Sequence, residues 1–401
     1  MIKKILITAA ALFSFTYISV GYSNSAPPLE ANTLNSKVNT TGQWVSVIGN
    51  LPLANPTTGY DNGYIKSTIE FNKKQYVTGS DKAGGGFVYV YNGNDQNPAW
   101  TSVASFKGPV TAVTVYKNTL YAYIPKMFDY YHNLFFSYNG DDKNPHWTRI
   151  STTGLPDDEY IQQLIVVNNK MYSRSVDSVY VYDDKNKSWS SVSKDMHFGI
   201  QAMTVFHDKL YVAGFDSGRP IDDSSKVEVY VYNSNDDAPS WSSVGAGLPL
   251  YIKNSDGMYL TARANTLNVF NDTLFVGGHD AEDMAFVYAY NGNDEIPNWS
   301  NVSNGLPNQG VVGSLVMANN TLYALGGERN GASYPFDLFV YAYNSNNSAP
   351  YWTPVSKNGL PLFTAFGESY SSLAAFNNTL YISSNGCDGG GPCSQFLYSL
   401  H

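Results

Sequence analysis

Histidines and acidic residues are the side chains of this chain whose types suit metal binding or acid–base chemistry. Three of the six histidines, His132, His197 and His279, fall in connections between predicted strands that should share one side of the molecule. Imidazole nitrogens are common metal ligands. Because these three come from different repeats, the sequence does not require them to meet, and solvated loop imidazoles are the expected state. We therefore predict no metal site and no cofactor.

Short acidic runs offer a second kind of chemistry. They occur at Asp157-Asp158-Glu159, at Asp222-Asp223, and at Asp280 with Glu282-Asp283. Glycosidases place two carboxylates across a sugar. Nothing distinguishes one of these pairs from ordinary solubilising loop residues, so no catalytic residue is assigned. An exported carbohydrate-active enzyme, either a hydrolase or an oxidase, remains the alternative function.

Three arginines suit anion recognition. Arg174, Arg219 and Arg329 have the forked donor geometry that holds a carboxylate or an anionic sugar. Surface salt bridges are the more ordinary use of such residues, and we favour that interpretation for these three.

A repeated hairpin has to position all of these side chains. Its clearest copy is Ala285–Pro307, in which aromatic or β-branched residues alternate with others, a polar turn follows, and a Trp opens a second strand. Alternation with period two predicts strands with two distinct faces. The chain has seven tryptophans, and each one occupies this position: Trp44, Trp100, Trp147, Trp189, Trp241, Trp299 and Trp352.

An acidic or amide residue lies five positions before each of these tryptophans. The set is Asn39, Asp95, Asp142, Asp184, Asp236, Asp294 and Asn347. Side chains of this kind often accept hydrogen bonds from backbone N–H groups of their own turn. We therefore predict that these residues shape the hairpin turns.

A second motif alternates with the first and consists of a short polar turn between two apolar runs. Asn118 and its equivalents carry Asn or Asp at these turns, and both residues tolerate the left-handed conformations of tight hairpins. The repeating unit is therefore four strands long and recurs about every 50 residues. Six full units are predicted: Ile65–Val103, Val110–Ile150, Ile161–Val192, Ile200–Val244, Ala262–Val302 and Gly313–Val355.

The two ends of the chain complete each other. The last unit has strands near Ser371–Phe376, Thr379–Ser383 and Gln395–Leu400 but lacks the strand that a Trp opens, whereas Gln43–Val47 is such a strand with no partners before it. The sequence therefore predicts an all-β fold, a seven-bladed β-propeller of four-stranded blades. The ring should be closed by an N-terminal outer strand beside three C-terminal strands, which leaves no open sheet edge.

Parts of the repeat resemble the kelch repeat of the galactose-oxidase/kelch propeller superfamily. Leu274–Gly278 ends in Gly-Gly and precedes Tyr290 and Trp299, and Leu322–Gly327 precedes Tyr343 and Trp352 in the same way. Val179–Trp189 has the usual kelch spacing from Tyr to Trp. The resemblance covers Gln43 to the C-terminus, although double glycine occurs in two blades only and five blades have two extra residues and a Pro before Trp. It implies a propeller fold. Galactose oxidase uses copper with a Tyr–Cys crosslink, which is not expected here because both cysteines share one short loop.

The first residues predict export. Lys3-Lys4 precede an apolar run from Ile5 to Val20 and small residues through Ser25-Ala26, which is typical of a secretory signal peptide. An uncleaved anchor is the second interpretation. We expect residues 1–25 to be the signal peptide, 26–41 a flexible tether and 42–401 the propeller, in a secreted or periplasmic protein without a membrane span after signal removal. In an exported chain, Cys387 and Cys393 are expected to form a disulfide.

Charge and loop variation limit the partners. The net charge of −9 and the lack of a basic run argue against nucleic acid. We label the four strands of each blade a to d in chain order. The a–b and c–d turns then lie on one side of the ring, and the b–c and d–a loops lie on the other. The first set is monotonous and the second is varied, which favours the second for recognition. We predict a module, expected to be monomeric, that binds a protein or glycan ligand there, at residues Tyr130, Tyr131, His132, Arg219, His279, Arg329 and Tyr334.

Overall fold

The computed structural model describes most of the chain downstream of residue 41. The described residues are 42–53, 63–81, 83–126, 132–194, 196, 198–215, 227–249, 252–253, 259–260, 262–329, 336–345, 350–355, 370–387 and 393–400. These residues contain no helix, and therefore none that is long and apolar enough to cross a membrane. The predicted signal peptide and tether lie outside them.

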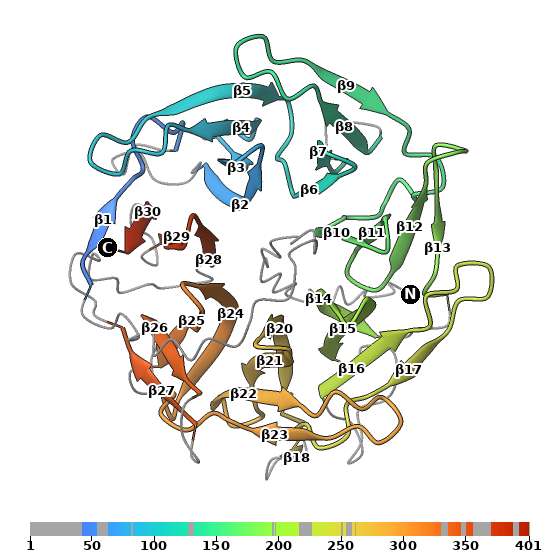
Figure 1. The fold of residues 1–401 in the computed structure, drawn as a ribbon, viewed down its shortest axis with the longest axis vertical. Coiled ribbons are helices and arrows are strands. Elements are labelled where there is room, and N and C mark those ends of the chain that lie inside the picture. The colour runs from blue at the N-terminus through green and yellow to red at the C-terminus, as the bar shows by residue number, and fades with distance from the viewer. Residues whose placement is uncertain are drawn as a thin grey trace, which may run out of the picture.

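Seven antiparallel four-stranded sheets are arranged around a central axis (Figure 1), which confirms the predicted seven-bladed β-propeller. Within each blade, the first strand is innermost and the fourth is outermost. Blade one has β2 (Tyr64–Phe71), β3 (Lys74–Ser80), β4 (Gly86–Tyr91) and β5 (Trp100–Phe106); blade two has β6 (Ala112–Tyr116), β7 (Thr119–Ile124), β8 (Leu134–Tyr138) and β9 (Trp147–Ile150); blade three has β10 (Gln163–Val167), β11 (Lys170–Arg174), β12 (Val179–Asp183) and β13 (Ser188–Ser191). Blade four has β14 (Gly199–Phe206), β15 (Lys209–Phe215), β16 (Val227–Tyr232) and β17 (Trp241–Ser243); blade five has β20 (Arg263–Phe270), β21 (Thr273–His279), β22 (Ala285–Tyr290) and β23 (Trp299–Asn301); blade six has β24 (Gly310–Ala318), β25 (Thr321–Arg329), β26 (Phe336–Asn344) and β27 (Tyr351–Pro354). Blade seven has β28 (Tyr370–Phe376), β29 (Thr379–Cys387) and β30 (Cys393–Leu400), with β1 (Trp44–Ser46) as its outermost strand.

Blade seven is assembled from both ends of the described chain, as predicted. β1 pairs antiparallel with β30, so that Trp44 lies opposite Leu400 and Ser46 opposite Tyr398. The backbone N–H of Val47 adds a hydrogen bond of 2.9 Å to Leu397 O. In Figure 1, the blue β1 lies beside the red β30. The N-terminal strand thus covers what would otherwise be an open edge.

The first hairpin turn of every blade has the predicted left-handed backbone. Both central residues have positive φ, for example 54° at Asn118 and 50° at Asn168. Two successive positive φ values define a type I′ turn, whose twist matches that of the flanking strands. Asn and Asp supply most of these positions because their short polar side chains tolerate this conformation.

The tryptophans join each blade to the one before it. In five blades, the indole N–H donates to the backbone carbonyl of a valine in the preceding blade. The pairs are Trp100–Val47, Trp147–Val103, Trp241–Val192, Trp299–Val244 and Trp352–Val302, at 2.7 to 2.9 Å. The indole N–H of Trp189 is buried without a hydrogen-bond partner among the described residues, and we have no physical account of this difference.

Four of the aspartates five positions before the tryptophans, Asp142, Asp184, Asp236 and Asp294, accept hydrogen bonds from tyrosine and lysine side chains and not from backbone N–H groups of their own turns, so that prediction was wrong for them. Asp142 instead accepts the hydroxyls of Tyr76 at 2.7 Å and Tyr138 at 2.8 Å and the ammonium of Lys74 at 2.5 Å. Tyr76 and Lys74 belong to the preceding blade. The turns are shaped by neighbouring amides, as where Asn92 Oδ1 accepts the N–H of Asn94.

One further hairpin lies outside the blades. β18 (Ile252–Lys253) pairs with β19 (Tyr259–Leu260) in the long connection between blades four and five. The sequence placed this connection on the varied side of the ring, and the described strands show that it contains a small sheet of its own.

Candidate functional site

A β-bulge interrupts the innermost strand of four blades at the same position. The extra residues are Lys66 in β2, Gln201 in β14, Asn265 in β20 and Gly313 in β24. A bulge leaves one residue outside the ladder and changes the direction of its side chain. Recurrence at the same point of four blades shows that the bulge belongs to the repeat.

A glycine on the second strand makes room for each bulge. These glycines are Gly79, Gly214, Gly278 and Gly326, and each lies beside a bulge in the register. A Cβ at Gly79 would lie 1.8 Å from Tyr64 O, and one at Gly326 would lie 1.9 Å from Val311 O. Real side chains cannot approach a carbonyl oxygen so closely, so glycine is required there.

The same level of the other three blades is also polar. The ladder registers place Thr111 in blade two, Gln162 in blade three and Ser371 in blade seven at the position of the bulged residues. We call these seven positions the polar ring: Lys66, Thr111, Gln162, Gln201, Asn265, Gly313 and Ser371. The strands that follow or contain them are the innermost of their blades (Figure 1).

Hydrogen bonds link members of the polar ring to the next blade. Thr111 Oγ1 donates to Ile161 O at 2.9 Å, and Asn265 Nδ2 donates to Val312 O at 3.2 Å. In each case, the acceptor is the residue immediately before the next ring position. Part of the ring therefore holds the inner strands together, as expected for buried polar groups that need partners.

Two cations lie buried at this level. Lys66 is 6% exposed and Arg174, at the end of β11, is fully buried. They are the only buried charged side chains in the described part of the chain, and both are positive. The pKa of Lys66 is lowered to about 7, chiefly by burial and in smaller part by the positive charge of Arg174.

Arg174 is held by neighbouring polar groups. Its guanidinium donates to Gln163 Oε1 at 3.0 Å, to Gln162 Oε1 at 2.6 Å and to Ile200 O at 2.9 Å. It therefore joins blades three and four beside the polar ring. The prediction that Arg174 forms a surface salt bridge is wrong. Arg174 lies on the second strand of a blade, where its side chain points into the packed interior.

Two positions of the polar ring offer a hydrogen-bond acceptor or space to a ligand. Asn265 Oδ1 is buried, and no hydrogen-bond donor contacts it in the described structure. A Cβ at Gly313 would meet only Leu325 O within 4 Å, at 3.7 Å, and Gly313 is partly exposed although it lies on an innermost strand. Gly313 therefore leaves space beside its position on the innermost strand.

The polar ring lies toward the side of the b–c and d–a loops. Its members stand near the start of the innermost strands, where the d–a connections arrive, and Arg174 stands at the end of a second strand, where a b–c connection leaves. This is the side predicted for ligand binding. The opposite side carries the type I′ turns.

The structure describes three of the seven predicted binding residues: His132 lies in a b–c connection, and His279 and Arg329 end the second strands from which such connections leave. His132 is 64% exposed and its Nδ1 lies 3.1 Å from Asp157. His279, at the end of β21, donates from Nδ1 to Asp280 O at 3.1 Å, and burial lowers its pKa. Arg329 ends β25. Tyr130, Tyr131, Arg219 and Tyr334 lie outside the described residues, so their role stays a prediction.

The other candidate groups have local partners. Asp280 Oδ1 accepts the N–H groups of Glu282 and Met284 within its own loop, and Glu159 accepts the hydroxyl of Tyr180 at 2.7 Å. Within the described ranges, no three His, Cys, Asp or Glu side chains are grouped so that they could hold a metal ion. His197 and Asp222-Asp223 lie outside those ranges.

Sequence reasoning missed the polar ring, although a signal was present. At the start of the innermost strands, an apolar residue is followed by a polar residue or glycine, as in Ile65-Lys66, Val110-Thr111, Ile161-Gln162, Ile200-Gln201, Ala264-Asn265 and Val312-Gly313. Within one strand this looks like ordinary alternation. Only the alignment of six blades at one level shows that the polar residues belong together.

The fold and the inter-blade contacts define a seven-bladed β-propeller, an architecture commonly used for binding. The chain belongs to the family described as the DUF6242 β-propeller domain, whose model matches residues 113–395. No curated protein sequence matches the chain. Among solved structures, the one described as "Structure of YjhT" is similar at 13% identity and a TM-score of 0.45, over 86% of this chain and 97% of that chain.

Proposed function

We propose that the protein is an exported kelch-like propeller that binds a glycan or protein ligand on the side of the b–c and d–a loops. Within that class, we propose a ligand with an anionic group and hydroxyls, the chemistry of an acidic sugar. The observation that carries this proposal is the pair of buried cations, Lys66 and Arg174, beside the polar ring. Two positive side chains at one level of the ring would attract an anionic group of a ligand.

An anionic group near Lys66 would favour the charged lysine. The pKa of Lys66 is lowered to about 7, mainly by burial, so the protonated form is disfavoured in the free protein. A bound carboxylate would raise this pKa again because an opposite charge stabilises the ammonium. Binding should therefore take up a proton above neutral pH.

Hydroxyl groups of a ligand would complement the polar ring at Asn265 and Gly313. Asn265 Oδ1 is an acceptor with no described donor, and a sugar hydroxyl is a donor of suitable size. Gly313 provides space at the same level of the ring. These two positions favour a hydroxylated ligand over a simple inorganic anion.

The first test compares acidic and neutral oligosaccharides by calorimetry and on a glycan array. Glucuronate- or galacturonate-containing oligosaccharides are expected to bind, and Lys66→Met is expected to weaken them by about tenfold or more. Lys143→Met is the matched control because it removes the same charge from an exposed turn on the opposite side. Equal weakening by both variants, or equal binding of neutral sugars, would contradict the proposal.

The second test uses pH. Since the ligand prefers protonated Lys66, affinity should fall as pH rises above about 7, by at most about tenfold per pH unit. The Lys66→Met variant should lose this dependence. A wild-type affinity that stays flat between pH 6 and about pH 9 would contradict the role of Lys66.

The binding side itself is tested with single alanine substitutions. The residues to substitute are those of the varied loops, Tyr130, Tyr131, Arg219, Arg329 and Tyr334, since exposed Tyr and Arg often dominate binding energy. Asn92, Asn233 and Asn291 on the turn side serve as controls. If only the control variants weaken binding, the ligand binds on the side of the turns and the proposal is wrong.

A carbohydrate-active enzyme is the second candidate. A lysine with a pKa near neutrality suits general base catalysis, and the pKa of Lys66 is about 7. Products released from the bound oligosaccharides, detected by mass spectrometry and lost in Lys66→Met, would favour the enzyme. Stable binding without turnover would favour the binding module.

A further inference from the structure

One position on the second strand of each blade faces the preceding blade. In six blades this residue is apolar and belongs to the hydrophobic cluster that joins the two blades: Leu120, Met171, Leu210, Leu274, Leu322 and Leu380. Blade one has Gln75 there, as the second residue of β3. The equivalence of the blades therefore directs Gln75 toward blade seven. We call the interface between blades seven and one the seam.

The residue opposite Gln75 is polar as well. The ladder register pairs Gln75 with Glu70, which is exposed. The other blades place an apolar pair here: Val115–Leu120, Val166–Met171, Val205–Leu210, Val269–Leu274, Met317–Leu322 and Ala375–Leu380. Directly opposite residues lie on the same face of a sheet. Blade one therefore turns two polar side chains toward the seam, where each other blade turns apolar ones toward its neighbour.

The amide of Gln75 is buried without hydrogen bonds in the described structure. Gln75 is 1% exposed, and neither Nε2 nor Oε1 has a hydrogen-bond partner there. Such a group bears the full cost of desolvation, and water removes that cost when the group becomes exposed. Separation at the seam therefore relieves Gln75, whereas separation at the other interfaces exposes an apolar side chain and is opposed by the hydrophobic effect.

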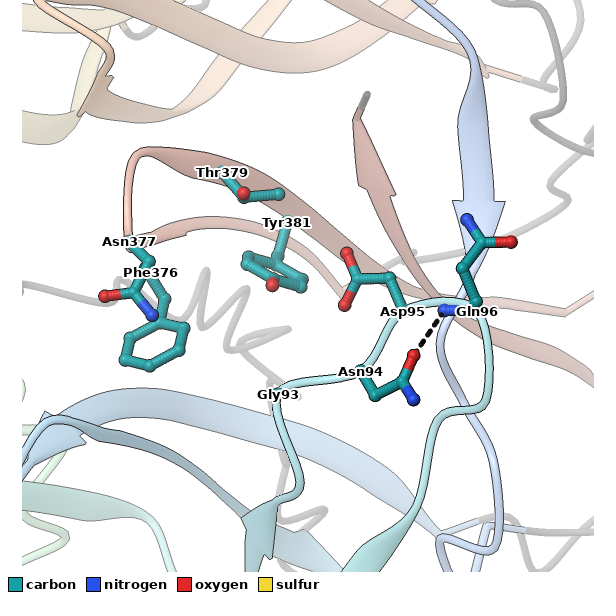
Figure 2. A pocket seen from close by; sticks show the side chains of 8 residues that line it. All are labelled: Gly93, Asn94, Asp95, Gln96, Phe376, Asn377, Thr379 and Tyr381. Carbon is teal, nitrogen blue, oxygen red and sulfur yellow. Dashed lines mark hydrogen bonds between the residues drawn. The ribbon is translucent and has the colours of Figure 1, made fainter.

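The two blades also leave space between them at the seam. A cavity of about 330 Å³ lies there (Figure 2). Phe376 and Tyr381 line it from the first hairpin of blade seven, and Gly93 and Gln96 line it from the c–d turn of blade one. Unfilled space removes the dispersion contacts that hold neighbouring surfaces together. The seam therefore resists separation less than a filled interface of the same area would.

The chain has no peptide connection between β30 and β1 in blade seven. In the other six blades, the third and fourth strands are successive in the sequence, whereas β1 and β30 come from opposite ends of the described chain. β1 contacts β30 through three residue pairs and the hydrogen bond from Val47 N–H to Leu397 O. Along the chain β1 leads into blade one, where Trp100 Nε1 donates to Val47 O. The rest of blade seven can therefore part from β1 without breaking the chain.

We propose that the propeller opens along the seam: β28, β29 and β30 separate together from β1 and blade one, while the other blade interfaces stay closed. Opening exposes the Gln75 amide to water and releases the Val47 hydrogen bond in one step. Proteins open in contiguous units of this kind at less than the cost of global unfolding. Since β2 carries Lys66 of the polar ring, opening also frees one flank of that strand. The proposal concerns the closure of the ring and is independent of the proposed function.

Thiol labelling of buried cysteines in the full propeller measures the opening. Ala374→Cys places a thiol at the seam, and Ala213→Cys places one at the interface between blades four and five; both alanines are buried. We expect Ala374→Cys to react about tenfold or more faster, because only the seam opens below the cost of global unfolding. Peptide mapping separates these thiols from Cys387 and Cys393. Equal labelling rates at the two positions would overturn the proposal.

Gln75→Leu tests why the seam opens. This substitution replaces an amide that has no partner in the described structure with the residue of blade two, Leu120, so the labelling of Ala374→Cys should slow by about tenfold or more. Met171→Leu makes the matched change in blade three, where the residue is already apolar, and should leave the rate unchanged. If Gln75→Leu leaves the rate unchanged, or if Met171→Leu slows it equally, Gln75 does not control the seam.

Hydrogen exchange at the Val47 amide shows whether the ring itself parts. This N–H is bonded to Leu397 O, so it exchanges when β1 separates from β30. Gln75→Leu should slow its exchange by the same factor as the labelling of Ala374→Cys, because one opening exposes both groups. Slower labelling with unchanged exchange would confine the motion to the cavity and overturn the opening. Both measurements are made without a ligand, so their outcome leaves the proposed function of the polar ring to its own tests.

Discussion

The indole N–H of Trp100 donates a 2.8 Å hydrogen bond to the carbonyl oxygen of Val47, which lies 53 residues earlier in the chain. Val47 continues the N-terminal strand of blade seven, and Trp100 opens the last strand of blade one. Asn50 strengthens the same junction, since its side chain bonds both the N–H and the carbonyl oxygen of Trp100, at 2.7 and 2.9 Å. The ring is thus closed by hydrogen bonds within blade seven and across to blade one.

Removal of the closing strand should destabilise the ring. Deletion of residues 27–47 removes β1 and the Val47 acceptor and exposes the edge of β30, so the melting temperature should fall sharply and aggregation should increase. Deletion of residues 27–39 leaves β1 intact and should have little effect. Differential scanning calorimetry measures both. Similar small shifts for the two deletions would show that β1 does not close the ring.

The tryptophan hydrogen bond can be separated from tryptophan packing. Trp100→Phe removes apolar area and leaves Val47 O without its donor, whereas Trp189→Phe removes similar area from an indole whose N–H is unpartnered among the described residues. Trp100→Phe should therefore cost about 1 kcal/mol more in the free energy of unfolding. Chemical denaturation measures the difference, and equal losses would mean that the hydrogen bond contributes nothing.

The inter-blade aspartates should matter more than their neighbours. Asp236 accepts the ammonium of Lys170 and the hydroxyls of Tyr172 at 3.1 Å and Tyr232 at 2.9 Å. Adjacent Asp237 is exposed. We expect Asp236→Asn to lower the free energy of unfolding by about 1–3 kcal/mol and Asp237→Asn to change it by less than about 0.5 kcal/mol. If thermal unfolding ranks them in the opposite order, the blades are not joined in this way.

Stability should rise between pH 7 and pH 9 because of Lys66. Its folded pKa is about 7 and the unfolded value is 10.5, so the unfolded chain binds more protons within this window. Stability therefore increases with pH, by at most about 1.4 kcal/mol per pH unit. Above about pH 10 the trend reverses, because buried tyrosines such as Tyr211 have raised pKa values and resist ionisation only when folded.

Urea denaturation at several pH values measures this slope. Lys66→Met should flatten it, and Lys143→Met should preserve it, because Lys143 is exposed. Arg174, which also lowers the pKa of Lys66, stays protonated throughout the window and does not add a slope of its own. A slope that survives Lys66→Met would assign it to other groups.

A disulfide between Cys387 and Cys393 stays a prediction, and the backbone register favours it. The two residues lie directly opposite each other in the pairing of β29 with β30. Directly opposite residues of antiparallel strands have Cα atoms about 4.5–5.5 Å apart, within the range of disulfides. The closed loop is short, so reduction should cost about 2 kcal/mol of stability.

Mass spectrometry of the exported protein without reduction tests this bond. We expect one linked peptide that contains both cysteines. Cys387→Ser should leave a single alkylatable thiol at Cys393, whereas two alkylatable thiols in freshly exported wild-type protein would rule the bond out.

The sequence alone determined the repeat, the blade number, the turn conformations and the closure of the ring. Period-two alternation and Asn-rich turns are local properties, so each blade could be read from its own residues, as at Asn118 and Asn168. The complementary ends, Gln43–Val47 and Gln395–Leu400, then required closure. These features depend on contacts within one hairpin or on counting strands.

Only the tertiary structure decided where the side chains of different blades meet. Asp142 looked like a turn residue, but its partners Lys74 and Tyr76 lie more than sixty residues away in the sequence, at separations of 68 and 66. Likewise, Lys66 and Arg174 come from blades one and three and influence each other only once the ring has formed. Local patterns specify the strands and turns, whereas a site built between blades depends on registers that a sequence read blade by blade does not contain.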